Sequence, residues 1–362
     1  MLYKSWCFKQ ECISTLHQFL LKMTSTESPS MSLQSLTIIP ADITTIPANR
    51  SHIELCTVES QHVSIPVILL LVFEVGFLLN SFSLWVFCFH IPYWSSGTTL
   101  QFNLALSDAL GTPATPLMAV YLTNGSKWTF GPLLCVFKIA LLSAHFFGSI
   151  LFLMLISIHR YVAVVQFNKS SRMKQKEFVR KLCGGVWLVL LVEALVLSSL
   201  LPPSKEGGST QCLTTHQHNL TDVYFVINFF LFILGFLLPF SVAAESYRRL
   251  ANSVSQLNIN SAKGLAIKIK SQRMIGICLV IFGLCFLPLN LVRTLGVVVN
   301  KYSKACTMLR HLDTAYYVSF ILAGVNSCLD PLLYCFGSQT FRKLFQGGSF
   351  RVGQTNTQRS TT

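Results

Sequence analysis

Asp108, Arg160, Arg293 and Asp330 are ionisable residues that lie inside long apolar runs of the sequence. A charged side chain in the middle of a bilayer costs at least about 2.5 kcal/mol, and such side chains usually face a bundle interior, where they find a partner or water. Carboxylates placed there can hold a cation, and guanidinium groups can hold an anion. All four residues are therefore candidates for a function.

The apolar run that contains Arg160 also carries Lys138, His145 and Ser149, at spacings of seven, four and eleven residues. At 100° per residue, these four lie on one face of an α-helix, within roughly 40° of each other. A helix that presents polar groups repeatedly in one direction has a polar interior neighbour on that side and not lipid. We therefore expect this helix to lie inside a bundle.

In the last apolar run, Asn326, Asp330 and Tyr334 recur every four residues and share a face. Asp108, in the second run, supplies another carboxylate at a similar depth. Together with Ser149 and the amide, two buried carboxylates form a pocket of hard oxygen atoms that suits a small cation such as Na⁺, or a water cluster. The alternative is a hydrogen-bonded polar knot that only stabilises helix packing.

The sixth run places Phe282, Phe286, Asn290 and Arg293 on one helical face. Pro288 lies among them, removes a backbone donor and kinks the helix, which makes a natural hinge. The two rings lie below the kink, and the amide and the guanidinium lie above it, toward the outside. Arg293 either extends its charged end to the membrane interface or fixes an anionic ligand group through paired hydrogen bonds.

Seven helices can position these residues. A bilayer core of about 30 Å needs roughly 20 apolar residues for each helical crossing, and the chain supplies such runs near residues 65–90, 98–122, 133–165, 182–201, 223–247, 274–299 and 314–336. The chain is 52% hydrophobic and only 12% charged, whereas about a quarter of the residues of a soluble domain are charged. The sequence therefore predicts an all-α membrane protein, a seven-transmembrane helix bundle.

The net charge of +14 has a consistent placement, because Lys and Arg concentrate in the connections after the third, fifth and seventh runs. Such residues mark cytoplasmic loops, so we expect a cytoplasmic C-terminus and, with an odd number of crossings, an extracellular N-terminus. This placement argues against a nucleic-acid partner. Three glycosylation sequons fall on the predicted outer side, at Asn49, Asn124 and Asn219.

We expect three parts in the chain. Residues 1–64 form an extracellular N-terminal segment that is largely disordered, residues 65–337 form the bundle, and residues 338–362 form a cytoplasmic amphipathic helix and tail. Four cysteines are predicted to lie on the outer side: Cys56, Cys135, Cys212 and Cys306. The oxidising exterior permits disulfides there, although spacing alone does not fix their pairing.

Taken together, these residues resemble the rhodopsin-like family of G-protein-coupled receptors over about residues 65–346. The matching positions are Asn80, Asn103-Leu-Ala-Leu-Ser-Asp108, Cys135, Arg160, Trp187, Pro239, Tyr247, Phe282, Phe286, Pro288 and Asp330-Pro331-Leu-Leu-Tyr334. The segment 341–345 looks like the short amphipathic helix that follows the seventh span in this family. The resemblance also favours the disulfides Cys135–Cys212 and Cys56–Cys306.

The resemblance implies a receptor in the plasma membrane that activates heterotrimeric G proteins, with an arrestin and a receptor kinase as further partners beside membrane lipids. An agonist bound near the outer ends of the third, sixth and seventh spans would swing the sixth helix outward at its proline and open an inner groove. The expected switch residues are Arg160, Tyr161, Tyr247, Phe282, Pro288 and Tyr334. His159 stands where an Asp is more common beside Arg160, and Lys268 stands where many relatives carry an acid, so we expect signalling without ligand.

Within the family, the chain looks most like the purinergic nucleotide receptors and their lipid and metabolite relatives. The segments 149–161, 286–293 and 315–330 carry this likeness, and it implies an extracellular anionic agonist, nucleotide-like in the favoured reading. The implied pocket comprises Lys138, Leu142, Phe286, Asn290, Arg293, Tyr316 and Phe320. Two positions depart from the pattern, since many nucleotide receptors carry His at the position of Asn290 and a cation at that of Phe320.

Several alternatives stay open. One cation beside an apolar wall also suits a lysophospholipid, a fatty-acid derivative or a small carboxylate. A peptide agonist remains an alternative too, whereas a cationic amine lacks its usual Asp at Leu142. From other classes, a transporter would show related halves, which the sequence lacks, and a non-signalling scavenger would lack the inner coupling residues. No nucleophile–base pair or zinc-ligand cluster indicates an enzyme, and we expect no cofactor beyond a bound Na⁺.

Overall fold

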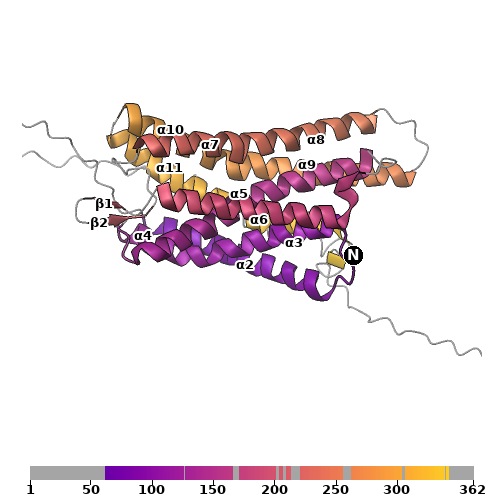
Figure 1. Ribbon diagram of the computed structural model, residues 1–362, viewed down its shortest axis with the longest axis horizontal. Coiled ribbons are helices and arrows are strands. Elements are labelled where there is room, and N and C mark those ends of the chain that lie inside the picture. Colours follow the sequence, from indigo (N-terminus) through magenta and orange to yellow (C-terminus); the bar gives the residue numbers. More distant parts are fainter. Residues whose placement is uncertain are drawn as a thin grey trace, which may run out of the picture. The chain divides into compact units, whose positions relative to one another are not determined.

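The computed structural model describes residues 62–125, 127–165, 171–200, 204–206, 209–212, 221–255, 262–303, 306–338 and 340–341. Among these residues, six helices are long and apolar enough to cross a membrane: Ser64–Phe89, Gly131–Val165, Lys176–Leu200, Thr221–Ser253, Gly264–Tyr302 and Cys306–Gly337. They lie side by side in a bundle (Figure 1). The predicted all-α fold class is confirmed.

The second predicted span is divided into shorter pieces. It consists of α3 (Ser96–Gly111), the 3₁₀ turn η1 (Thr112–Ala114) and α4 (Thr115–Thr123). Pro113 and Pro116 lie near the starts of η1 and α4, where a missing N–H costs little but an unbroken helix cannot continue. The expectation of one continuous helical run is therefore wrong for this span.

Two further spans contain π-helical turns just before a proline. The fifth span runs through α7 (Thr221–Phe232), η4 (Ile233–Leu237) and α8 (Leu238–Ser255), and the sixth through α9 (Ala262–Ile281), η5 (Phe282–Phe286) and α10 (Leu287–Tyr302). Pro239 and Pro288 follow these turns. Because proline removes a donor and crowds the preceding turn, a local widening to π geometry is a common adjustment.

The remaining spans are α2 (Ser64–Phe89), α5 (Gly131–Val165), α6 (Lys176–Leu200), and the pair α11 (Cys306–Gly324) and α12 (Asn326–Gly337). The 3₁₀ turn η2 (Arg172–Lys174) precedes α6. Helix α5 is the central element, since α3, α6, α8 and α9 all pack against it. This position fits the polar face that the sequence predicted for it.

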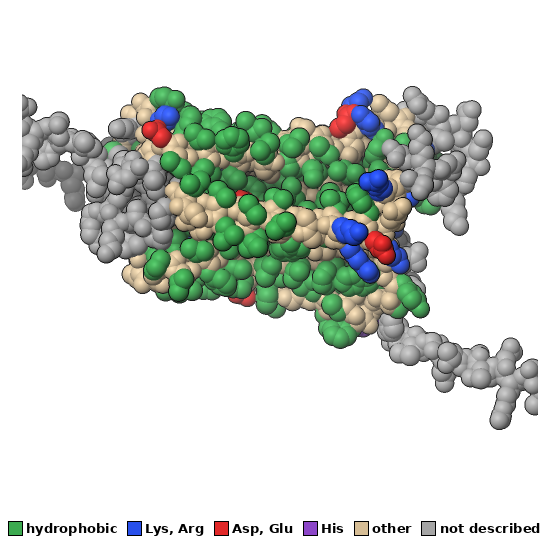
Figure 2. Space-filling view, viewed as in Figure 1, with side chains coloured by type: hydrophobic (Ala, Val, Ile, Leu, Met, Phe, Trp, Pro, Cys, Tyr) green, Lys and Arg blue, Asp and Glu red, His purple; other side chains and the backbone are tan. Residues whose placement is uncertain are grey.

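Apolar side chains cover the middle of the visible surface of the bundle, and charged side chains gather near its two ends (Figure 2). On α6, the exposed residues include Leu188, Leu191 and Leu195, which are 61%, 56% and 56% exposed. A surface of this kind matches a lipid environment around the middle of the bundle.

A short hairpin was not predicted from the sequence. Strands β1 (Ser204–Glu206) and β2 (Ser209–Gln211) pair antiparallel, with Ser204 opposite Gln211, and the chain then reaches Cys212. Residues 1–61 and 342–362 lie outside the described residues, so the N-terminal segment and most of the predicted amphipathic helix remain predictions. Phe341 is described, and its ring packs 4.7 Å from Phe87 and 5.7 Å from Tyr334, between ring centroids.

Candidate functional site

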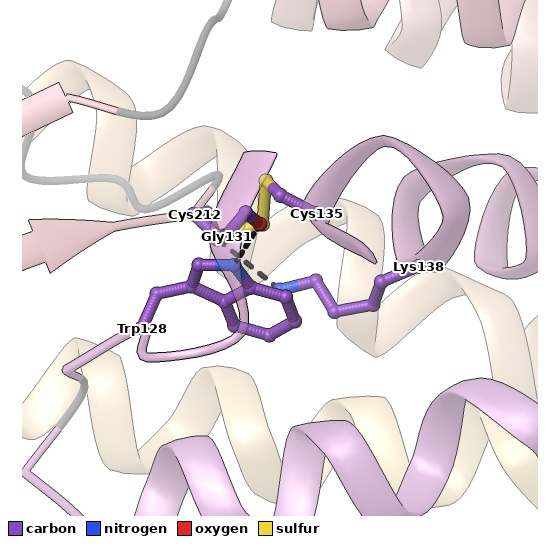
Figure 3. The surroundings of a disulfide bond; sticks show 5 residues. All are labelled: Trp128, Gly131, Cys135, Lys138 and Cys212. Carbon is purple, nitrogen blue, oxygen red and sulfur yellow. Dashed lines mark hydrogen bonds between the residues drawn. A yellow bond between two sulfur atoms is a disulfide. The ribbon is translucent and has the colours of Figure 1, made fainter. Parts of the chain in front are cut away.

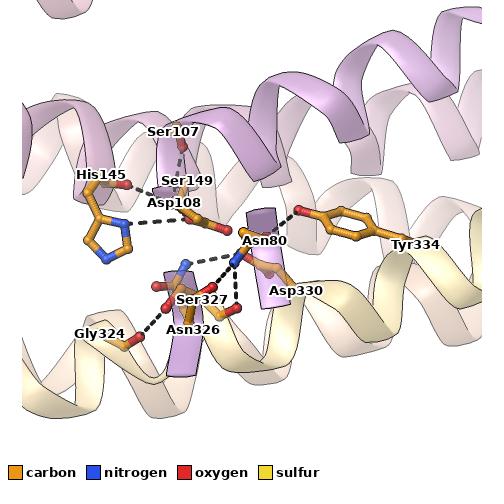
Figure 4. A network of polar contacts seen from close by, with 11 residues as sticks. Asn80, Ser107, Asp108, His145, Ser149, Gly324, Asn326, Ser327, Asp330 and Tyr334 are labelled. Atoms are coloured by element: carbon orange, nitrogen blue, oxygen red, sulfur yellow. Dashed lines mark hydrogen bonds and ion pairs between the residues drawn. The ribbon is translucent and has the colours of Figure 1, made fainter. Parts of the chain in front are cut away.

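A buried polar network joins α2, α3, α5 and α12 (Figure 4). Oγ of Ser149 in α5 lies 2.5 Å from Oδ1 of Asp108 in α3 and 2.6 Å from the backbone oxygen of His145. Ser107 extends the chain of contacts, with its Oγ 3.4 Å from that of Ser149. The hydroxyl and the carboxylate therefore meet as the helical spacing predicted.

The other half of the network comes from α12 and α2. Asn326 Nδ2 donates a hydrogen bond of 3.1 Å to Oδ2 of Asp330. Asn80 Nδ2 donates to the backbone oxygen of Ser327 at 2.7 Å, and the hydroxyl of Tyr334 donates to Oδ1 of Asn80 at 3.3 Å. These bonds fasten the first span to the seventh next to the carboxylates.

Three oxygen atoms of this network are buried and have no hydrogen-bond partner among the described residues: Oδ2 of Asp108, Oδ1 of Asp330 and Oδ1 of Asn326. The two carboxyl groups also interact with each other. Buried acceptors left unpaired cost about 1–3 kcal/mol each, and a small hard cation is the ligand that such oxygens prefer. The predicted cation residues Asp108, Ser149, Asn326 and Asp330 are thus brought together, and they fit an ion such as Na⁺.

His145 borders this pocket, which the sequence analysis did not anticipate, although it placed the residue on the correct face of its helix. Its Nδ1 lies 3.6 Å from Oδ1 of Asp108, and both side chains are fully buried. The imidazole ring also lies 5.2 Å from the ring of Phe73, between centroids. The signal that could have found it is the four-residue spacing between His145 and Ser149.

At the end of the bundle that carries the β-hairpin, the predicted disulfide Cys135–Cys212 is confirmed, with 5.8 Å between the Cα atoms (Figure 3). Lys138 lies beside it and is 3% exposed. Its Nζ donates to the backbone oxygen of Cys212 at 3.1 Å and lies 5.0 Å from the Tyr121 ring and 4.8 Å from the Trp128 ring. Since cation–π contacts and a loop carbonyl already surround this ammonium group, its predicted role in ligand binding is weakened.

Arg293 and Asn290 lie next to each other on α10. Nη2 of Arg293 donates to Oδ1 of Asn290 at 2.8 Å, and Nδ2 of Asn290 donates to the backbone oxygen of Phe286 at 2.9 Å. Nε of Arg293 is buried and has no partner within the described part of the chain. Asn290 therefore orients the guanidinium, and Arg293 keeps donors open for another group.

The aromatic residues predicted for the pocket form a wall. Phe320 is 4% exposed and packs against Phe146 and Tyr316, with centroid distances of 4.9 Å and 6.2 Å. Phe286 is fully buried against Phe282, at 6.2 Å. Leu142 is half-buried on α5. Phe286 and Phe320 thus belong to the core beneath any ligand and are less open to direct contact than predicted.

At the other end of α5, Arg160 is half-buried, and its Nε has no partner among the described residues. No ion pair to a carboxylate within 4.0 Å is found for Arg160 in the described ranges. A Cβ added at Gly97 would lie 3.0 Å from Cε1 of His159 and 3.7 Å from Nη2 of Arg160, so α3 packs closely there. The predicted weakness of the ionic restraint agrees with this geometry.

The other predicted switch residues surround Arg160 and the sixth helix. Tyr161 accepts a hydrogen bond from Arg249, and Nε of Arg249 donates to Glu245 at 2.6 Å. Phe282 is fully buried, with its ring 5.9 Å from that of Phe240. Tyr247 is half-buried facing α9, where a Cβ added at Gly276 would lie 3.6 Å from its Cε2. These contacts join α5, α8 and α9 at the end of the bundle where Lys and Arg gather.

Glu193 was missed in the sequence analysis. It lies within the apolar helix α6, so the argument applied to Asp108 should have found it. The carboxylate of Glu193 interacts electrostatically with Arg293. Its Oε1 is buried and has no hydrogen-bond partner in the part of the chain that is described.

The remaining covalent sites are only partly described. Asn124 ends α4 and is exposed, as a glycosylation acceptor must be. Cys306 is disulfide-bonded, whereas its predicted partner Cys56 lies outside the described residues, as do Asn49 and Asn219.

Comparison with known proteins identifies the family. Residues 79–334 match the 7 transmembrane receptor (rhodopsin family) model. The chain is 32% identical to human Y-type purinoceptor 2 over 280 residues, which cover 77% of this chain and 74% of that receptor. It is 31% identical to rat Y-type purinoceptor 4 over 80% of both chains, and 31% identical to chicken Y-type purinoceptor 1 over 77% of both. The chain therefore belongs to the rhodopsin family of seven-transmembrane receptors and is not an enzyme.

Proposed function

We propose that this receptor binds an extracellular anionic small molecule, nucleotide-like in chemistry, and activates heterotrimeric G proteins. The observation that carries the proposal is the open, buried Nε of Arg293 beside an Asn290 that holds the guanidinium in place. Guanidinium groups recognise phosphate and carboxylate oxygens through directed hydrogen bonds. The names of the similar purinoceptors support a nucleotide as the first class of ligand to test.

The pocket that we propose is centred on Arg293, with Tyr316 and Asn290 beside it and the aromatic wall beneath. Lys138 is engaged by Cys212, and Lys301 forms an ion pair of 3.3 Å with Asp222. With these two cations already occupied, the site favours an anion with few charges over an extended polyphosphate. A lysophospholipid, a fatty-acid derivative or a small carboxylate is thus the second candidate, and this thin set of cations is the observation that favours it.

The switch that we propose is an outward movement of the sixth helix at the π turn η5 and Pro288. Phe282 packs against Phe240 in the adjacent fifth span, so a swing at this point has to repack both rings. Such a movement would open the groove beside Arg160 to a G protein. A ligand drives it only to the extent that it binds one arrangement more tightly than the other.

A sodium ion fits the buried oxygens of Asp108, Ser149, Asn326 and Asp330, and we propose that these residues hold it. When bound, the ion supplies positive charge between two carboxylates that otherwise repel each other. The four residues come from α3, α5 and α12, so they tie three spans together in one arrangement of the bundle. Any change that separates these helices pulls the oxygens apart and weakens the site.

We propose the plasma membrane as the location, with the N-terminus outside and the C-terminus in the cytoplasm. The Lys- and Arg-rich connections support this orientation, and so does the disulfide at the opposite end of the bundle. Arrestin and a receptor kinase are further proposed partners at the cytoplasmic side.

The experiment is a ligand screen on cells that express the receptor, with calcium and cyclic AMP recorded together. The panel contains nucleoside di- and triphosphates, nucleotide sugars, lysophospholipids and dicarboxylates, and cells with empty vector are the control. We expect a saturable response to at least one nucleotide. A response confined to lipids or carboxylates would replace the first candidate by the second, and a response to neither would contradict the proposal.

A further inference from the structure

Glu193 is an acid in the middle of an apolar helix that the proposed mechanism does not use. It is half-buried, and the neighbouring exposed residues of α6 are apolar. Its Oε1 is shielded from solvent and has no hydrogen-bond donor beside it among the described residues. A buried acceptor of this kind costs free energy unless a donor from outside the chain satisfies it.

The group that Glu193 faces is Arg293. The two side chains interact electrostatically, yet no ion pair within 4.0 Å joins them in the described ranges. Nη2 of Arg293 is instead directed to Asn290, and Nε of Arg293 is unpaired, like Oε1 of Glu193. A donor and an acceptor are thus both left open, near each other but not satisfied by each other.

The surroundings add a second open acceptor. Asn228 in α7 is 1% exposed and donates from Nδ2 to Oγ1 of Thr294, the residue after Arg293, at 3.2 Å. Its Oδ1 has no partner within the described residues. Tyr224 and Tyr316 also lie within the electrostatic range of Arg293. The site therefore offers one cation together with acceptors from two other helices.

This inference rests on the proposed function and specifies its ligand. We propose that the ligand carries, next to its anionic group, a group that donates hydrogen bonds, and that Glu193 accepts from that group while Arg293 holds the anion. A plain fatty-acid carboxylate would satisfy Arg293 but would leave Glu193 unpaired beside a second negative charge. A nucleotide with its base amine and sugar hydroxyls, or a hydroxy acid, satisfies both side chains.

The test pairs probes that differ only in a donor group. Adenosine diphosphate is compared with its analogue whose base amine is dimethylated and with its analogue that lacks the sugar hydroxyls; malate is compared with succinate. Each probe is measured as a dose response on the wild-type receptor and on E193L, E193Q and E177Q. Glu177 is an exposed acid in the first turn of the same helix and serves as the matched control.

On the wild type, we expect removal of the donor to lower potency about tenfold or more, the size expected for an unpaired buried acceptor. On E193L, the two members of a pair should differ less than about threefold, while E177Q keeps the wild-type difference. E193Q keeps the shape of the side chain and covers the case in which E193L does not reach the cell surface, and it should reduce the preference by a smaller factor.

Equal donor preference in the wild type and in the Glu193 variants would overturn the inference. A general rise in potency of all anions in E193L, with no change in donor preference, would overturn it too and would make Glu193 a plain counter-ion of Arg293. Failure of the proposed function looks different, since no nucleotide then acts on the wild type. The malate and succinate pair then decides the inference alone, and lack of any donor-dependent effect there refutes it.

Discussion

Nδ1 of His145 lies 3.6 Å from Oδ1 of Asp108, with both side chains fully buried. The close approach of their helices explains this contact, because a Cβ added at Gly111 would lie 2.8 Å from Cβ of His145. The imidazole closes one side of the oxygen pocket, and Ser149, Asn326 and the second carboxylate line the rest. The pocket is therefore small and bounded on every described side, which favours a small ion.

Sodium should stabilise the purified receptor more than the bulky cation N-methylglucamine at equal ionic strength. If sodium is present at ten times its Kd, binding adds about 1.4 kcal/mol to the free energy of unfolding. D108N should lose this difference, because it removes one of the two carboxylates. The measurement is the thermal unfolding midpoint in each salt.

The control for this prediction is D222N, which removes a carboxylate in the first turn of α7. It should keep the sodium effect whatever its own midpoint is. An unfolding midpoint that does not distinguish the two salts in the wild type would remove the support for a sodium site.

K138M should destabilise the receptor by about 1–3 kcal/mol, because it leaves the backbone oxygen of Cys212 without its donor and removes two cation–π contacts. Agonist potency should change little once surface expression is matched. The measurement combines thermal unfolding with a dose response. Normal stability with a potency loss of more than tenfold would show instead that Lys138 binds the ligand, as its sequence position suggests.

Cells that express the receptor should signal without ligand, because Arg160 has no carboxylate partner in the described part of the chain. H159D places an acid next to Arg160 and should lower this basal signal. Second-messenger levels are compared with those of empty vector at matched surface expression. Basal levels equal to those of the vector control would show that another contact restrains the inner end.

G76A should lower the unfolding midpoint, because an added Cβ would collide with Oγ of Ser327 where α2 meets α12. Overpacking of this kind typically costs about 1–3 kcal/mol. G184A is the matched control, since a Cβ at Gly184 meets no atom within 4 Å, and it should be neutral or slightly stabilising. Equal effects of the two substitutions would contradict the close packing of the first span against the seventh at Gly76.

The spans and the cation pocket could be predicted because both follow from simple periodicity. Runs of apolar residues fix the crossings, and a four-residue spacing puts Asn326 and Asp330 on one face. The polar face of α5 was also correct, but its helical angle says nothing about depth. Lys138 and Arg160 lie about 33 Å apart along the axis at 1.5 Å per residue, so they meet different neighbours.

Other features depend on contacts between helices, which periodicity does not reveal. The engagement of Lys138 by a loop carbonyl requires the disulfide to place Cys212 over the bundle. The π turns before Pro239 and Pro288 depend on how the chain relieves a missing donor, and the sequence indicated only a kink. Glu193 was within reach of the same argument that found Asp108, and its partner Arg293 became clear only when α6 and α10 were placed.

The central claim is that Arg293 holds the anionic group of the agonist, and the most direct measurement is the dose response of R293A and R293K to the agonist found in the screen. We predict that R293A loses at least about 100-fold in potency at normal surface expression, and that R293K recovers part of it, because an ammonium group keeps the charge but not the paired hydrogen bonds. A dose response of R293A that matches the wild type at equal surface expression would contradict the account.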